Sequence, residues 1–110
     1  MEFKQVELES QSFRIAVKEG DVEIGRVFLY LIHNGLHKQP YGLIEDLFVK
    51  KEFRRKGIGA LLLKKVIEKA KENKCYKILA TSRYENSLAH AFYDKFGFKK
   101  HGFEFRLNLD

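Results

Sequence analysis

One stretch of the sequence constrains the fold more than any other, because a strand-like segment runs through a basic glycine loop into a helix. Residues 43–49, LIEDLFV, have the character of a strand, and residues 50–56 contain five basic side chains and one acid. From Gly57 to about Asn73, apolar residues recur at helical spacing, with lysines and glutamates between them. The first N–H groups of a helix lack intrahelical partners and carry partial positive charge, so this junction suits an anion such as a phosphate.

Two glycines in this stretch, Gly57 and Gly59, let a phosphate approach the backbone closely because they carry no Cβ. The segment is not a Walker loop, because Gly59 is followed by Ala60 and Leu61 rather than by a lysine and a hydroxyl residue. It is not the dinucleotide fingerprint either, because the third glycine position holds Leu62. From the loop alone, an anion site and a simple glycine turn before a solvated helix stay equally open.

The other segments predict a sheet with helices packed on it. Several strands precede the first helix, which argues against a doubly wound nucleotide fold and favours a mixed sheet in a single domain, residues 1–110. The apolar centre of the second hairpin strand, VFLYLI, is typical of a strand covered on both faces. In chain order we expect a short strand at 3–8, a hairpin of strands at 13–17 and 22–32 joined by KEGD, a loop at 33–41, a strand at 75–81, a helix from Asn86 or Ser87 to Phe96 that Gly97 ends, and a last strand carrying Phe103, Phe105, Leu107 and Leu109.

The composition narrows the class of protein. A net charge of +6 and a pI near 9.4 favour an anionic ligand, which could be nucleic acid, a phosphorylated cofactor or an acidic partner. No apolar run approaches the ~20 residues that span a bilayer, and the first ten residues lack the anatomy of a signal peptide, so we expect a cytoplasmic protein without membrane contact. Cys75 is the only cysteine, so neither an intrachain disulfide nor a cysteine metal cluster is possible, and no metal is expected.

Two motifs resemble the landmarks of the GCN5-related N-acetyltransferases, the GNAT superfamily. Residues 54–59, RRKGIG, match the pattern Q/R-x-x-G-x-G/A, and residues 86–98, NSLAHAFYDKFGF, resemble N-x-x-A-x-x-F/L-Y-x-K-x-G-F. The pair is far more specific than either motif alone, and the resemblance runs from Tyr41 to the C-terminus. It implies an α+β, GNAT-like acyl-CoA N-acyltransferase fold, with a central mixed, mostly antiparallel sheet splayed in the middle, helices on both faces, and N-terminal helices abbreviated or absent.

The resemblance also implies the reaction, which is transfer of acetyl from acetyl-CoA as cosubstrate to an amine acceptor, either a small molecule or a protein amine. The pantetheine arm of the coenzyme would add to the backbone of β-strand residues 47–49, and its pyrophosphate would lie on the N–H groups of residues 55–60. Asn86 would touch the coenzyme arm, and Tyr93 would serve as general acid. The coenzyme-binding residues implied in this way are Leu47, Phe48, Val49, Arg54, Arg55, Lys56, Gly57, Ile58, Gly59, Ala60, Asn86 and Tyr93.

The chemistry of acetyl transfer agrees with these assignments. The developing oxyanion needs a preorganised donor, for which a strand N–H near Phe48 is the natural candidate. A phenol with a pKa of about 10 suits the protonation of a leaving alkyl thiolate. The general base is less defined, because residues 79–82, LATS, contain no acid. We expect Glu45 to act through a water, with Asp46 as the alternative and His33 and His37 as further candidates.

The N-terminal part of the chain departs from the family. Only twelve residues precede Phe13, too few for the two helices that cover the acceptor site in family members. The acceptor side is therefore expected to be open, or closed by a second subunit in a homodimer, and small-amine acetyltransferases such as glucosamine-6-phosphate N-acetyltransferase are the best analogy. A non-catalytic coenzyme A-binding or partner-binding module stays open as an alternative. A nucleic-acid-binding protein is the third class, but no nucleic-acid motif or aromatic interleaving supports a nucleic-acid partner.

Overall fold

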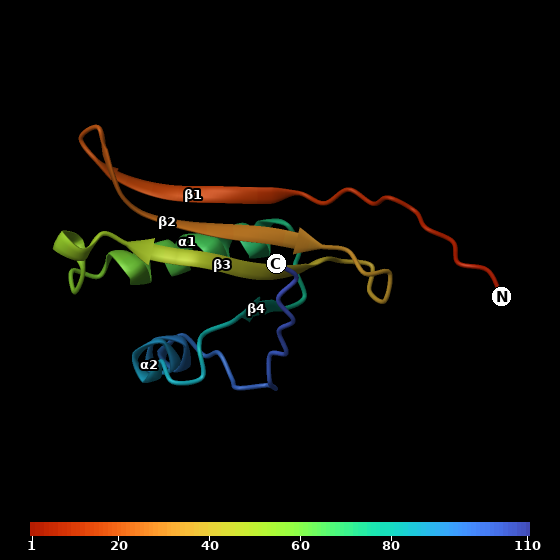
Figure 1. Ribbon diagram of the computed structural model, residues 1–110. Coiled ribbons are helices and arrows are strands. Elements are labelled where there is room, and N and C mark those ends of the chain that lie inside the picture. The colour runs from red at the N-terminus through yellow and green to blue at the C-terminus, as the bar shows by residue number, and fades with distance from the viewer. The chain divides into compact units, whose positions relative to one another are not determined.

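The computed structural model describes residues 1–110, and the chain folds as two compact units, Met1–Ala80 and Thr81–Asp110. The first unit contains a four-stranded sheet, a short 3-10 helix and a long helix, whereas the second contains one helix (Figure 1). The elements are β1 (Ser12–Glu19), β2 (Val22–Ile32), β3 (Tyr41–Val49), η1 (Lys51–Phe53), α1 (Ile58–Glu72), β4 (Ile78–Ala80) and α2 (Ser87–Lys95).

The four strands form one mixed sheet in the order β1-β2-β3-β4. The β1–β2 and β2–β3 pairs are antiparallel, and β3 pairs with β4 in parallel. A tight turn at Gly20, where φ is +62°, joins β1 to β2 and gives the hairpin that the sequence predicts. The prediction of a mixed, mostly antiparallel sheet is confirmed.

Helix α1 lies across one face of the sheet, as Figure 1 shows. Its apolar stripe supplies Leu62, Leu63 and Val66, whose exposed fractions are at most 2%. The close approach of helix and sheet depends on Gly25 of β2, because a Cβ there would lie 3.0 Å from Leu62 Cδ1 and 3.1 Å from the Phe48 carbonyl oxygen. The core is made of Ile24, Val27, Leu29, Leu31, Ile44, Leu62, Leu63, Val66 and Ala70.

The prediction that β2 is covered on both faces is wrong for the face that carries Phe28 and Tyr30. Val27 and Leu29 are fully buried, whereas Tyr30 is 36% exposed and Phe28 is half-buried. The two rings stack on one another with their centroids 6.2 Å apart. The continuous apolar run therefore combines a core face with an aromatic face, since successive side chains of a strand point to opposite sides.

Helix α2 begins and ends as the sequence predicts. The Asn86 side-chain oxygen accepts a hydrogen bond from the Ala89 amide at 3.0 Å, which caps the first turn. Gly97 has φ +90°, and the amides of Gly97 and Phe98 donate back to carbonyls of the last turn. This pattern is a Schellman motif, which explains why a glycine ends the helix.

Neither terminal segment forms the strand that its pattern predicts. Residues 3–8 and 98–110 have no regular secondary structure, and the alternating apolar side chains from Phe103 to Leu109 are 81–92% exposed. A period-2 pattern makes a strand only where a neighbour pairs with its N–H and C=O groups. The fourth strand is also shorter than the expected 75–81. None of the helices is both long and apolar enough to cross a membrane.

Candidate functional site

The sheet separates at the carboxyl end of β3. Pairing with β4 ends at Ile44 and Ala80, and β3 then continues as residues 45–49, which pair only with β2. One edge of this segment thus carries no strand within the first unit. Its main-chain N–H and C=O groups can pair with an extended ligand. This is the splay that the family resemblance implies near Leu47 to Val49.

A β-bulge lies in the same segment of β3. Between the pair Arg26–Phe48 and the pair Phe28–Glu45, β3 contains one residue more than β2. Asp46 within the bulge has φ +54°, in the left-handed region that aspartate tolerates better than most residues. The sequence analysis missed this bulge, and the only signal for it is a pair of acids inside an otherwise apolar strand.

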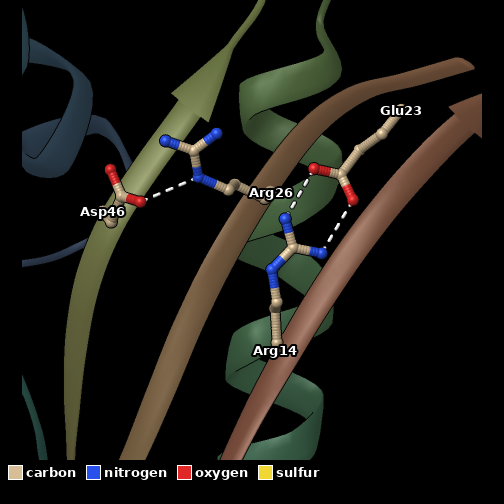
Figure 2. A network of polar contacts seen from close by, with 4 residues as sticks. All are labelled: Arg14, Glu23, Arg26 and Asp46. Carbon is tan, nitrogen blue, oxygen red and sulfur yellow. Dashed lines mark hydrogen bonds and ion pairs between the residues drawn. The ribbon is translucent and has the colours of Figure 1, made fainter.

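Two arginine–carboxylate pairs lie on the sheet beside the bulge (Figure 2). Arg26 Nε donates to Asp46 Oδ2 at 2.8 Å, and the Arg26 guanidinium lies 4.6 Å from the centre of the Phe48 ring. Arg14 donates to both carboxylate oxygens of Glu23, at 2.7 and 2.6 Å, and so joins β1 to β2. This hydrogen-bonded pair lowers the pKa of Glu23 below its ordinary value and raises the pKa of Arg14.

The basic loop is tied to the end of β3 by one of its cations. Arg54 Nε donates to the Val49 carbonyl oxygen at 2.8 Å, and the Arg54 guanidinium lies 5.6 Å from the Phe48 ring centre. Lys56 extends over the Phe53 ring, with its ammonium 5.4 Å from the ring centre. Arg54 thus has a structural contact in addition to its charge.

The first turn of α1 presents backbone N–H groups that no side chain caps. Gly57 is the N-cap residue with φ +81°, and the first turn contains no acidic residue. A Cβ at Gly57 would meet nothing within 4 Å, so the backbone there is open. Arg55 also has a positive φ, +65°, which is strained for a residue with a Cβ. Open amides, a positive helix end and nearby cations together fit a phosphate group.

The candidate general bases differ in exposure, in ion pairing and in their distance along the chain from the splayed end of β3. Glu45 is exposed and enters none of the ion pairs of the chain, whereas Asp46 is paired with Arg26. His33 and His37 lie in the loop before β3, at the opposite end of that strand from residues 45–49. The His37 ring lies against the Tyr76 ring at a tilt of 31°, with the ring centres 3.9 Å apart. Among these candidates Glu45 is the exposed acid at the splayed end of β3 that enters no ion pair, and its role as base stays a prediction.

Asn86 and Tyr93 belong to the second unit. The side-chain oxygen of Asn86 is the cap of α2, which leaves its amide nitrogen to contact a ligand. Tyr93 is half-buried, with its ring centre 5.6 Å from that of Phe92 and 5.3 Å from that of Phe98. The roles that the sequence suggests for Asn86 and Tyr93 stay predictions.

Comparison with known proteins decides the family. A family model described as the acetyltransferase (GNAT) family matches residues 2–98. The chain belongs to this GNAT acetyltransferase family. The match spans most of both compact units, and it agrees with the loop and helix geometry described above.

Known relatives place the chain among GNAT acetyltransferases. Streptothricin acetyltransferase A of Bacillus subtilis is 37% identical, over 87% of this chain and 58% of its own length. Glucosamine 6-phosphate N-acetyltransferase of Trypanosoma brucei brucei is 38% identical, over 62% of this chain and 44% of its own length. The crystal structure of glucosamine-6-phosphate N-acetyltransferase from Arabidopsis thaliana superposes with a TM-score of 0.80 at 22% identity, covering 90% of this chain and 67% of that one, which shows the shared fold. This GNAT chain thus spans about half the length of the two curated relatives.

Proposed function

We propose that this GNAT chain is an acetyl-CoA-dependent N-acetyltransferase that transfers acetyl directly to a primary amine. One observation carries the proposal. In a member of this family, the end of β3 has an unpaired edge, and a basic loop connects it to the start of α1, where no side chain caps the helix. The two features together suit a ligand with an extended amide-containing arm and a pyrophosphate. Coenzyme A has both.

The coenzyme would be held mainly by backbone groups. Residues 47–49 would pair with the pantetheine arm, and the amides of residues 55–60 would bind the pyrophosphate. Arg54 and Lys56 add positive charge beside those amides. The Asn86 amide nitrogen would donate to the coenzyme arm. No acid in the first turn of α1 opposes the anion.

Acetyl-CoA supplies an activated acetyl thioester, and the chain supplies donors and a proton acceptor. A strand N–H near Phe48, on the unpaired edge of β3, would donate to the thioester oxygen, which stabilises negative charge as it develops there. Tyr93 would give its phenolic proton to the departing thiolate. Glu45, exposed and free of ion pairs, would accept a proton from the amine through a water. An alkylamine has a pKa near that of lysine, about 10.4, so it must lose a proton before it attacks.

The acceptor is proposed as a small primary amine, with a protein amine as the second possibility. The relatives are named for streptothricin and glucosamine 6-phosphate. We further propose that residues 1–110 act as one GNAT domain, because the family model spans both units. A cytoplasmic location and a homodimer that closes the acceptor side belong to the same proposal.

The test is acetyl-CoA-dependent stabilisation followed by turnover with a panel of primary amines. Acetyl-CoA and CoA should both raise the melting temperature, and release of the coenzyme thiol should depend on the amine. Replacing the proposed acid, Tyr93→Phe, should lower kcat and leave the acetyl-CoA Kd nearly unchanged. A melting curve that neither acetyl-CoA nor CoA moves at millimolar concentration would contradict the proposal.

A non-catalytic coenzyme A-binding or partner-binding module is the second candidate. Two observations favour it, because each removes a candidate general base. Strand β4 consists of Ile, Leu and Ala and contains no acid, and Asp46 forms an ion pair with Arg26. Only Glu45 then remains near the splay as a base on β3. Tight acetyl-CoA binding with no thiol release across the amine panel would favour this module over the enzyme.

A further inference from the structure

We propose that Arg26 is a positioning residue, which holds the β-bulge at Asp46 and thereby fixes the main-chain N–H groups of residues 47–49. The inference rests on the proposed function, which assigns that edge to the pantetheine arm and a strand N–H near Phe48 to the thioester oxygen. Arg26 itself is given no contact with acetyl-CoA or with the amine.

The end of β3 has main-chain pairing on one side only. On one side it has passed the last pair with β4, so only β2 supports it. On that supported side the bulge interrupts the ladder, and the positive φ of Asp46 is unfavourable for a residue with a side chain. A segment in this condition changes direction easily unless other contacts fix it.

Arg26 makes those contacts on both sides of Leu47. Its Nε is 2.8 Å from Asp46 Oδ2 (Figure 2). Its guanidinium also lies over the Phe48 ring, 4.6 Å from the ring centre. Arg26 is also the β2 residue directly opposite Phe48 in the ladder. One planar group therefore contacts both the bulge residue and the Phe48 ring, in the segment that would supply the oxyanion donor, and an ammonium reproduces these two contacts only in part.

Arg54 holds the same segment from the loop. Its Nε donates to the Val49 carbonyl, and its guanidinium also lies over the Phe48 ring. Two arginines from different elements thus contact three of the last four residues of β3. Arg26 is the better test of positioning, because it lies outside the basic loop and adds no charge to the proposed phosphate site.

The pair Arg14–Glu23 provides a matched control. It too joins a guanidinium to a carboxylate across two strands, and the Arg14 guanidinium lies 5.7 Å from the Phe28 ring centre. Its hydrogen bonds and its ring contact lie on β1 and β2, and the only effect of β3 on it is the charge of Asp46, which adds to the raised pKa of Arg14. Removing it should therefore reproduce the loss of a surface ion pair without disturbing the coenzyme edge.

The experiment compares Arg26→Gln, Asp46→Asn, the double variant and Arg14→Gln in the full chain. Asparagine keeps the tolerance for a left-handed backbone, so Asp46→Asn removes only the charge. We expect each Arg26 or Asp46 variant to weaken acetyl-CoA affinity about three- to fivefold by calorimetry, with a fall in kcat at saturating acetyl-CoA. The double variant should bind acetyl-CoA as tightly as the more damaging of the two single variants, because both substitutions break the same ion pair. Arg26→Lys should recover part of the loss.

The Arg14→Gln control separates a positioning role of Arg26 from the general loss of a surface ion pair. Arg14→Gln should lower the melting temperature about as much as Arg26→Gln while leaving the acetyl-CoA Kd and kcat at their wild-type values. Equal Kd values for Arg26→Gln and Arg14→Gln would overturn the positioning role, and so would additive losses in the double variant. A wild-type chain that binds neither acetyl-CoA nor CoA would instead refute the proposed function itself.

Discussion

Placing an alanine at Gly57 tests whether the left-handed glycine at the start of α1 shapes the coenzyme site. Gly57 has φ +81° and an open Cβ position, so alanine meets no clash there. The only cost in folding free energy is that of holding alanine in a left-handed backbone conformation. That cost is roughly 1–2 kcal/mol, less the ~0.4–1 kcal/mol gained by restricting the unfolded chain. A net loss of about 1 kcal/mol corresponds to roughly 4–8 °C in melting temperature for a domain of this size.

Gly35 provides the matched control for this substitution. Its φ is +79°, its Cβ position is equally open, and it lies in the loop before β3. Gly35→Ala and Gly57→Ala should therefore lower the melting temperature of the ligand-free chain by similar amounts. Only Gly57→Ala alters the helix amides that would bind the pyrophosphate.

Melting curves with increasing acetyl-CoA separate the two glycine variants. Losing one hydrogen bond to a charged group costs about 1.5–3 kcal/mol, so Gly57→Ala should weaken acetyl-CoA binding about tenfold or more. Neutralising a nearby cation, Arg55→Gln, should have a smaller effect. If Gly57→Ala and Gly35→Ala show the same ligand-induced shift, or if Arg55→Gln is the more damaging change, the reasoning about the loop is refuted.

Three further predictions concern stability and reactivity. Gly25→Ala should destabilise the fold by about 1–3 kcal/mol in urea unfolding, because the rigid Phe48 carbonyl lies 3.1 Å from the added Cβ; an unchanged urea midpoint would contradict this packing. Glu23 has a pKa below its ordinary value of 4.5, so its pair with Arg14 stabilises the fold above that pH and is lost on further acidification. The melting-temperature difference between wild type and Arg14→Gln should accordingly narrow at low pH, and a constant difference would argue against the pair. Burial raises the pKa of the Cys75 thiol, so it should react with iodoacetamide more slowly at pH 7 than in urea; equal rates would show that burial does not protect it.

Local chemistry explains why much of the fold could be predicted. The turn residues around Gly20 set the hairpin, and the strand expected at about 22–32 is observed as Val22–Ile32. Asn86 and Gly97 mark the ends of α2 because capping and the left-handed conformation depend on nearby residues alone. The uncapped glycine start of α1 follows from the sequence in the same way.

The features that escaped prediction depend on partners distant in the sequence. The bulge at Asp46 arises from the pairing of β3 with β2, and nothing near Asp46 specifies which residue is the extra one. The role of Arg26 escaped for the same reason, because its contacts lie on another strand. The last strand was predicted from alternation in 103–109, but alternation does not supply a neighbour. Tertiary pairing decided each of these cases.

The central claim is that coenzyme A binds along the end of β3 and at the start of α1. An amide NMR titration of the isotope-labelled chain with acetyl-CoA tests it most directly, since each N–H reports its own surroundings. The account predicts that the largest shifts fall on the amides of residues 47–49 and 55–60. Saturable shifts confined to other residues, or no shifts at millimolar acetyl-CoA, would contradict it.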